Sequence, residues 1–222
     1  MNLYDKLSYA PLFQGMTNED LMQIIGQTKF AFRTFAPGDI IRNNGEPCMS
    51  MAFLIGGNMS VVTYADDYGY SVEESLGSPT VLQPERLFGL TQRYTHTFVA
   101  ETQCDLMEIG KDDVMRLSDE FVIFRLNLMN IVSTVSQKAE RSLWQPVPCG
   151  VRAKIVRFIM RHCVSPAGKK VVRVKMTRLA QEIGEGRLAV SGALNDMKRE
   201  GTICFSRGII TVNALECLSV VH

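Results

Sequence analysis

The chain has 222 residues, of which 46% are hydrophobic and 21% are charged, a balance close to that of soluble globular proteins. This composition excludes a disordered chain, a collagen and a coiled-coil rod, and no apolar run approaches the roughly 18 residues of a membrane span. Asp5 and Lys6 interrupt the opening stretch where a secretory signal needs an unbroken apolar segment, so we expect a cytoplasmic protein.

The division of charge along the chain predicts two domains with different roles. Residues 1–145 hold 11 Lys and Arg against 18 Asp and Glu, whereas residues 146–222 hold 13 against 5. A domain with such a basic excess binds nucleic acid by releasing counterions from the phosphates. We therefore expect the last third of the chain to bind DNA.

The first 110 residues begin with short helices and continue as strands. Thr17 precedes three polar residues, Asn18-Glu19-Asp20, as the N-cap of a helix with acids in its first turn. Strand and turn signals then recur every 8–12 residues, a spacing typical of antiparallel sandwiches and barrels. The expected strands are 30–35, 40–41, 51–55, 59–64, 70–76, 97–102 and 105–109.

A helical period of 3.5 residues begins after Lys111. Apolar residues recur at alternating spacings of three and four, the pattern of a coiled-coil seam. From residues 119 to 143 the helix would be about 37 Å long, and Pro146 and Pro148 end it in a hinge. We expect a homodimer through this helix, with the interface formed by Phe121, Phe124, Leu128, Ile131 and Val135. The alternative is an amphipathic helix that packs on its own sheet.

The basic segment contains a predicted helix-turn-helix. An amphipathic helix over 152–162 and a short strand over 171–174 precede two compact helices, 176–183 and about 187–200, which are separated by Gly184. A hairpin with Arg207 at its tip follows and makes the unit winged. Arg187 and Ser191 lie one turn apart at the end of the second helix that meets base edges in the major groove. The predicted DNA-binding residues are Lys175, Thr177, Arg178, Gly186, Arg187, Leu188, Ser191, Asn195, Lys198 and Arg207.

Two stretches, VKMTRLAQEIGEGRLAVSGALNDMKREGTI and FSRGIITV, resemble the winged helix-turn-helix of the CRP/FNR transcription regulators. Near the start, PLFQGMTNEDLMQI and PGDIIRNNGEP resemble the opening helices and first β-roll turns of that family. The resemblance implies an α+β fold in three parts. Residues 1–110 form an antiparallel β-roll of the double-stranded β-helix (jelly-roll) type, 111–145 the dimerisation helix and 146–222 the winged helix-turn-helix. It also implies that Arg187 matches the recognition-helix arginine, whereas Leu188 stands where the family has glutamate.

The resemblance also predicts a sensor domain without the usual ligands for cyclic AMP. Tyr94-Thr95 stands where the family has an Arg-Ser or Arg-Thr pair for the cyclic phosphate, and Leu90 replaces the glutamate that binds the ribose. We therefore do not expect cyclic AMP to bind. The alternative is a cyclic-nucleotide-responsive regulator whose phosphate site is rebuilt around Arg93. Leu90, Arg93, Tyr94 and Thr95 are the candidate effector-pocket residues.

Other chemistries find little support in the sequence. The six cysteines lie at least 13 residues apart, which excludes CxxC zinc and redox motifs and an iron–sulfur run. His96 as a haem ligand and Cys104 as a redox sensor lack supporting neighbours. We expect that the protein is not an enzyme and that it binds no metal, and the sequence identifies no cofactor. The expected partners are double-stranded DNA with a pseudo-palindromic operator, a second copy of the chain and, for an activator, RNA polymerase.

Overall fold

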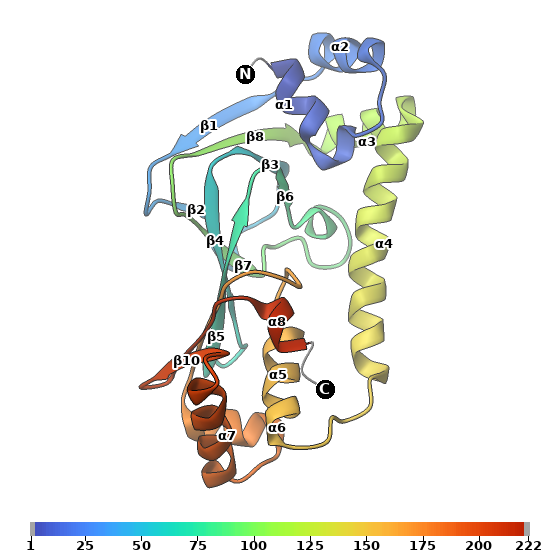
Figure 1. The fold of residues 1–222 in the computed structure, drawn as a ribbon. Helices are drawn as coiled ribbons and strands as arrows, with labels where there is room; N and C mark the ends of the chain where they lie inside the picture. The colour runs from blue at the N-terminus through green and yellow to red at the C-terminus, as the bar shows by residue number, and fades with distance from the viewer. Residues whose placement is uncertain (1–2, 220–222) are drawn as a thin grey trace. The chain divides into compact units, whose positions relative to one another are not determined.

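The computed structural model describes residues 3–219, and the chain divides into two compact units (Figure 1). The first unit contains residues 1–59 and 76–143, and the second contains residues 60–75 and 144–222. This division differs from the predicted one, because residues 60–75 were expected to belong to the β-roll. Within the described range, no helix is long and apolar enough to span a membrane.

The first unit is an antiparallel β-roll with helices before and after it, as predicted. One sheet has the order β1-β8-β3-β6, and β2 pairs with β7 in the other. Thr17 caps the second helix in a reciprocal capping box with Asp20. The elements are α1 Leu3–Tyr9, η1 Pro11–Phe13, α2 Asn18–Gln27, β1 Ala31–Phe35, β2 Ile40–Arg42, β3 Ser50–Gly56, β6 Thr80–Leu82, η2 Pro84–Arg86, β7 His96–Ala100, β8 Cys104–Gly110, α3 Lys111–Glu120 and α4 Val122–Trp144.

The long helix α4 begins at Val122 and not at residue 119 as predicted, because Phe121 has an extended backbone between α3 and α4. Phe121 and Phe124 were predicted in the dimer seam, but both are buried in their own unit. The ring of Phe124 lies 5.3 Å from that of Phe13, which also packs 5.8 Å from Phe53. The start of α4 therefore covers its own β-roll. Leu128 and Ile131 are half-buried, and only Val135 of the predicted seam is exposed.

Four exposed apolar side chains lie on one side of α4, and none of them belongs to the predicted seam. They are Val122, Leu126, Met129 and Val132, at spacings of four, three and three residues, while Ile123, Val135, Leu143 and Trp144 are exposed at other positions of the helix. We call the first four the α4 stripe. It differs from the predicted seam because the sequence period shows which residues share a face, and not which face the β-roll covers.

The second unit combines the helices and strands of residues 144–222 with the outer part of the long hairpin formed by β4 and β5. Its strand order is β10-β11-β9-β5-β4, so the hairpin strand β5 pairs with β9. The helices α5, α6 and α7 pack together beside this sheet (Figure 1). The elements are β4 Asn58–Tyr64, β5 Tyr70–Gly77, α5 Val151–Arg161, β9 Lys170–Val174, α6 Met176–Ile183, α7 Arg187–Arg199, β10 Ile203–Ser206, β11 Ile209–Val212 and α8 Leu215–Ser219.

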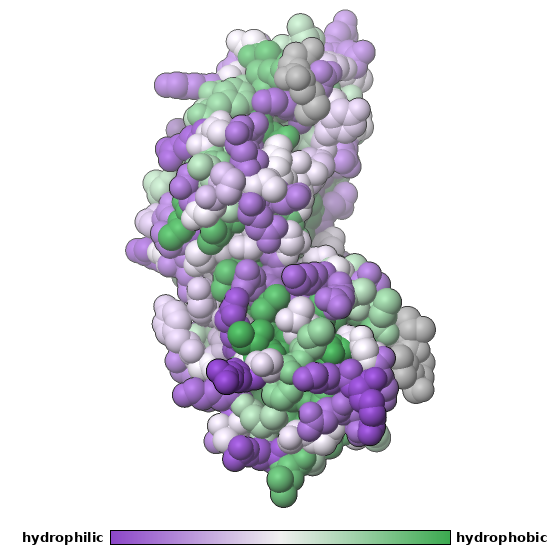
Figure 2. Space-filling view, turned by 60° about the vertical axis from the view of Figure 1, so that its left-hand side comes forward, coloured by the Kyte–Doolittle hydropathy of each residue, from purple (hydrophilic) through white to green (hydrophobic). Residues whose placement is uncertain are grey.

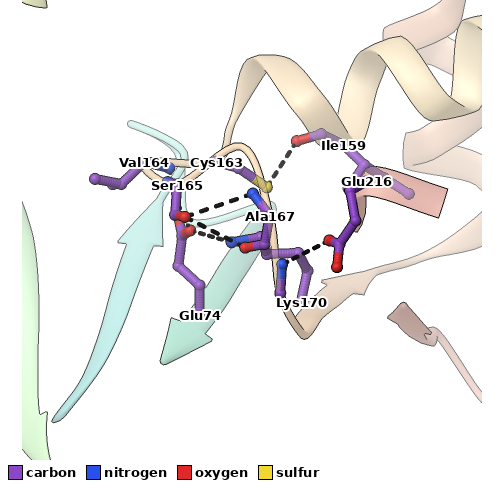
Figure 3. Close-up of polar contacts among 9 residues, drawn as sticks. Glu74, Ile159, Cys163, Val164, Ser165, Ala167, Lys170 and Glu216 are labelled. Atoms are coloured by element: carbon purple, nitrogen blue, oxygen red, sulfur yellow. Dashed lines mark hydrogen bonds and ion pairs between the residues drawn. The ribbon is translucent and has the colours of Figure 1, made fainter. Parts of the chain in front are cut away.

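A buried ion pair anchors the hairpin in the second unit (Figure 3). The Glu74 carboxylate on β5 accepts hydrogen bonds from Lys170 Nζ at 2.6 Å and from the backbone N–H groups of Val164 and Ser165 at 2.5 and 3.0 Å. Both charged side chains are almost completely buried. A buried carboxylate needs such a full set of donors to offset its lost hydration. Residues 60–75 are thus an integral part of this unit.

Candidate nucleic-acid interface

The second unit has two compact helices at the residues predicted for the helix-turn-helix. Helix α6 ends at Gly184, whose backbone is left-handed at φ +64° and ψ +43°, and α7 begins after Gly186. Leu179 on α6 and Val190 and Leu194 on α7 are buried in one core with the apolar residues of α5. This packing fixes one face of α7 and leaves the opposite face in solvent.

The outward face of α7 presents a basic side chain with no partner. Arg187 is exposed and makes no hydrogen bond or ion pair with any residue among 3–219. The first turn of α7 contains no acidic residue, and no side chain caps its N-terminus. Arg199 at the other end of the helix is instead paired with Asp196 at 2.5 Å. The free guanidinium therefore lies at the end of α7 that was predicted to meet base edges.

The residues predicted to form the wing are a tight hairpin of β10 and β11. Ser206 pairs with Ile209, so Arg207 and Gly208 form a two-residue turn. Both turn residues have positive φ, +43° for Arg207 and +81° for Gly208, as a type I′ turn requires. The backbone of the exposed Arg207 thus has a conformation that glycine and asparagine adopt more readily than arginine. Lys198 of α7 donates to the Phe205 carbonyl at 3.2 Å and connects α7 to the wing.

The remaining predicted DNA-binding residues are divided between exposed and engaged positions. Lys175, Thr177, Gly186, Leu188 and Asn195 are exposed, and Ser191 is half-buried. Arg178 is engaged: its guanidinium contacts Asp67 at 2.9 Å and Glu182 at 2.8 Å. On the visible face in Figure 2, hydrophilic side chains lie around apolar ones in the second unit.

Arg178 also borders a hollow that the sequence did not predict. The hollow has a volume of about 390 Å³ and lies within the second unit. It is bordered by the turn that joins β4 to β5, by the end of α5 and by α6. Its lining comprises Thr63, Tyr64, Ala65, Asp66, Asp67, Tyr70, Val72, His162 and Arg178. Tyr70 Oη and His162 Nε2 are 2.9 Å apart in its wall. The pairing of a hairpin tip with a helix about 110 residues later leaves no local signal in the sequence.

In the first unit, the four candidate effector residues differ in exposure and in the contacts that they make. Leu90 is fully exposed, and Arg93 is exposed with its Nη1 donating to the Gly45 carbonyl at 2.7 Å. The side-chain amide of Gln83 engages both Thr95 Oγ1 at 2.7 Å and Thr95 N at 2.9 Å. Tyr94 is only 1% exposed and fills the interior.

The interior around Tyr94 contains a buried charge pair. Arg42 Nη2 lies 2.7 Å from Glu108 Oε1, and its guanidinium lies 5.9 Å from the centre of the Tyr94 ring. Ser50 also donates to Glu108 at 2.6 Å. Burial alone would raise the pKa of Glu108, but the hydrogen bonds from Ser50 and Arg42 outweigh it and lower that pKa. Burial raises the pKa of Tyr94, so its phenol stays neutral.

Comparisons with known proteins agree with the β-roll. Residues 32–121 match the family model of the cyclic nucleotide-binding domain. The sensor domain of the transcriptional regulator DNR from Pseudomonas aeruginosa is 17% identical with a TM-score of 0.51, covering 64% of this chain and 93% of that one. No curated protein matches the chain at a significant level.

Two further solved structures extend over most of the chain. The catabolite activator protein of Thermus thermophilus is 17% identical with a TM-score of 0.48, covering 95% of this chain and 97% of its own. The global regulator CLP of Xanthomonas campestris is 17% identical with a TM-score of 0.47, covering 89% and 99%. The family match and the DNR likeness confirm the predicted cyclic-nucleotide-binding fold of the β-roll.

Proposed function

We propose that this chain, which carries a cyclic nucleotide-binding domain, is a homodimeric, sequence-specific DNA-binding transcription regulator of the CRP/FNR type that acts in the cytoplasm. The observation that carries the proposal is the outward face of α7. Its first turn holds the unpartnered Arg187, and the segment around it is strongly basic. A guanidinium at this end of a helix in the major groove donates two hydrogen bonds to guanine.

Selection of bound duplexes from a random pool tests DNA recognition directly. With the full chain, we expect enrichment of a pseudo-palindrome whose half-sites lie about 34 Å apart, one turn of the duplex. Arg187→Ala should lose the enriched motif. Arg199→Ala is the matched control, because it removes the same group from the paired end of the same helix. A pool that stays random with the unmodified chain would contradict the proposal.

The α4 stripe supports a second copy of the chain as the dimer partner. Its four apolar side chains are at least 38% exposed and lie on one side of the helix, which a partner helix would cover. The double variant Leu126→Glu with Met129→Glu would bury charges in such an interface, so sedimentation should show monomers. Thr134→Glu, at an exposed polar position of α4, is the control and should remain dimeric. A monomeric wild type at micromolar concentration would refute this part.

We also propose that cyclic AMP is not the effector. A cyclic phosphate needs a positive charge in the pocket to offset its lost hydration. Tyr94 is neutral, and the buried Arg42 is already paired with Glu108. Isothermal titration with cyclic AMP and cyclic GMP should therefore give no micromolar binding. Micromolar binding that Arg93→Ala abolishes would instead support the alternative of a phosphate site rebuilt around Arg93.

A further inference from the structure

The first turn of α7 carries an exposed leucine beside the free arginine. Leu188 is 89% exposed, although the same helix buries Val190, Leu194 and Met197 in the core. The helix around Leu188 is well packed, so its exposure follows from its place on the outward face. One turn later stands Gly192, which is exposed and has no atom within 4 Å of the position of a Cβ. Leu188 therefore projects from α7 with an open space on one side.

The chemistry of the major groove limits what Leu188 can contact there. Its side chain has no donor or acceptor, and the groove displays one kind of apolar group, the C5-methyl of thymine. Any other base edge placed against the leucine would lose water without gaining a partner, which is unfavourable. The missing side chain at Gly192 lets a base edge approach the flank of Leu188.

We propose that Leu188 is a specificity-determining residue that selects thymine in each DNA half-site through contact with its C5-methyl group. The inference rests on the proposed function, because it requires α7 in the major groove. It assigns separate tasks to neighbouring residues: Arg187 reads guanine by hydrogen bonds, and Leu188 reads a methyl group by apolar contact.

Deoxyuridine provides the test, because it differs from thymidine only by this methyl group and keeps the same base pairing. Each thymine of the selected operator is replaced by deoxyuridine in turn, and affinity is measured by fluorescence anisotropy. At one position in each half-site, we expect the wild type to bind about fourfold more weakly, the value of burying one methyl-sized group. For the Leu188→Ala protein, the operators with thymine and with deoxyuridine at that position should bind with about equal affinity.

A matched control is Met22→Ala, which removes another exposed apolar side chain, from helix α2 of the first unit. It should keep the fourfold ratio. Since Leu188 is exposed, Leu188→Ala should unfold at the temperature of the wild type, which thermal unfolding checks. Equal affinities at every deoxyuridine position would overturn the role of Leu188 while leaving DNA recognition intact. Failure to select any operator would instead overturn the proposed function itself.

Discussion

Two arginines, one in each unit, show opposite uses of the same side chain. Arg42 lies inside the β-roll with its side chain 8% exposed, 2.7 Å from Glu108. Arg187 lies on the surface of α7 and contacts no carboxylate among residues 3–219. A buried charge must be paired because desolvation is costly, whereas a surface charge remains hydrated without a partner. The comparison teaches that the Arg42 charge supports the fold of the β-roll, whereas the Arg187 charge on α7 is free for a ligand.

The largest expected effect comes from breaking the buried pair. Arg42→Met should lower the free energy of unfolding by up to about 3–5 kcal/mol, because the buried Glu108 would lose its nearest cationic partner. Glu108 would keep only the more distant Arg33, at 3.6 Å, and the hydroxyl of Ser50. Urea denaturation measures this loss. The double variant Arg42→Met with Glu108→Met should recover much of it, since no unpaired charge remains. A single variant as stable as the wild type would show that the pair is not needed.

The pH dependence of stability sharpens the same contrast. The pKa of Glu108 is lowered in the folded chain. Its carboxylate therefore adds to the free energy of unfolding above the unfolded pKa of about 4.3, and this addition is lost as pH falls through the folded pKa. The stability difference between the wild type and Arg42→Met should therefore shrink in acid. Urea denaturation at neutral pH and at the lowest pH that keeps the wild type folded measures it. A difference that stays constant would contradict this account.

Arg187→Ala should produce the next largest effect, and on DNA binding instead of folding. The loss of a bidentate contact to guanine should weaken binding to the operator by about 1–3 kcal/mol and leave binding to scrambled duplexes nearly unchanged. Fluorescence anisotropy on both duplexes measures the difference. The free energy of unfolding should stay within about 0.5 kcal/mol of the wild type, as is usual for surface substitutions. An Arg187→Ala protein with full discrimination would mean that α7 is not the recognition helix.

The sequence predicted best what depends on neighbouring residues. Helix α6 spans the predicted residues 176–183, and α7 ends within one residue of its predicted end, because Gly184 and Gly201 are local stop signals. The face of α4 was harder to predict. A 3.5-residue period groups Phe124 with Leu128, but only packing shows that Phe124 contacts Phe13.

Pairings distant in sequence could not be predicted at all. The hairpin strand β5 joins β9 through residues about 100 positions apart, which places residues 60–75 in the second unit. The two hydrogen bonds between Gln83 and Thr95 and the ion pair between Asp67 and Arg178 also join residues from separate parts of the chain. Each depends on the folded backbone, so composition and spacing contain no sign of it.

Arg178 is intermediate between Arg42 and Arg187, because it is paired with carboxylates but lies only partly buried. Asp67→Asn should remove one of its two ion pairs and make its guanidinium available to a DNA phosphate. Because exposed pairs contribute about 0.2–1 kcal/mol, we expect DNA affinity to rise by a few-fold at most. The dependence on salt should become steeper by about one unit for one added phosphate contact. Asp66→Asn, beside it in the same hollow, is the control. Equal behaviour of the two variants would contradict a role for the Asp67 pair.

The smallest effect concerns the wing, where folding and binding should change in opposite directions. Arg207 is held at φ +43°, a left-handed conformation that disfavours an arginine. Asparagine tolerates this conformation without adding the backbone freedom of glycine, so Arg207→Asn should raise the free energy of unfolding by about 0.5 kcal/mol. If the arginine contacts a phosphate, the same variant should weaken binding to operator and scrambled duplexes equally. Its salt dependence should then flatten by about one unit.

Thermal unfolding and anisotropy across a salt series test both halves of this prediction. A variant that is more stable and binds DNA more weakly would show that the strained arginine is kept for the ligand and not for the fold. Cys204→Ser, at an exposed position on the same hairpin, is the control and should leave the salt dependence unchanged. Loss of stability in Arg207→Asn would mean that the arginine supports the turn, as Arg42 supports the β-roll. Loss of discrimination between the duplexes would mean that the wing reads bases.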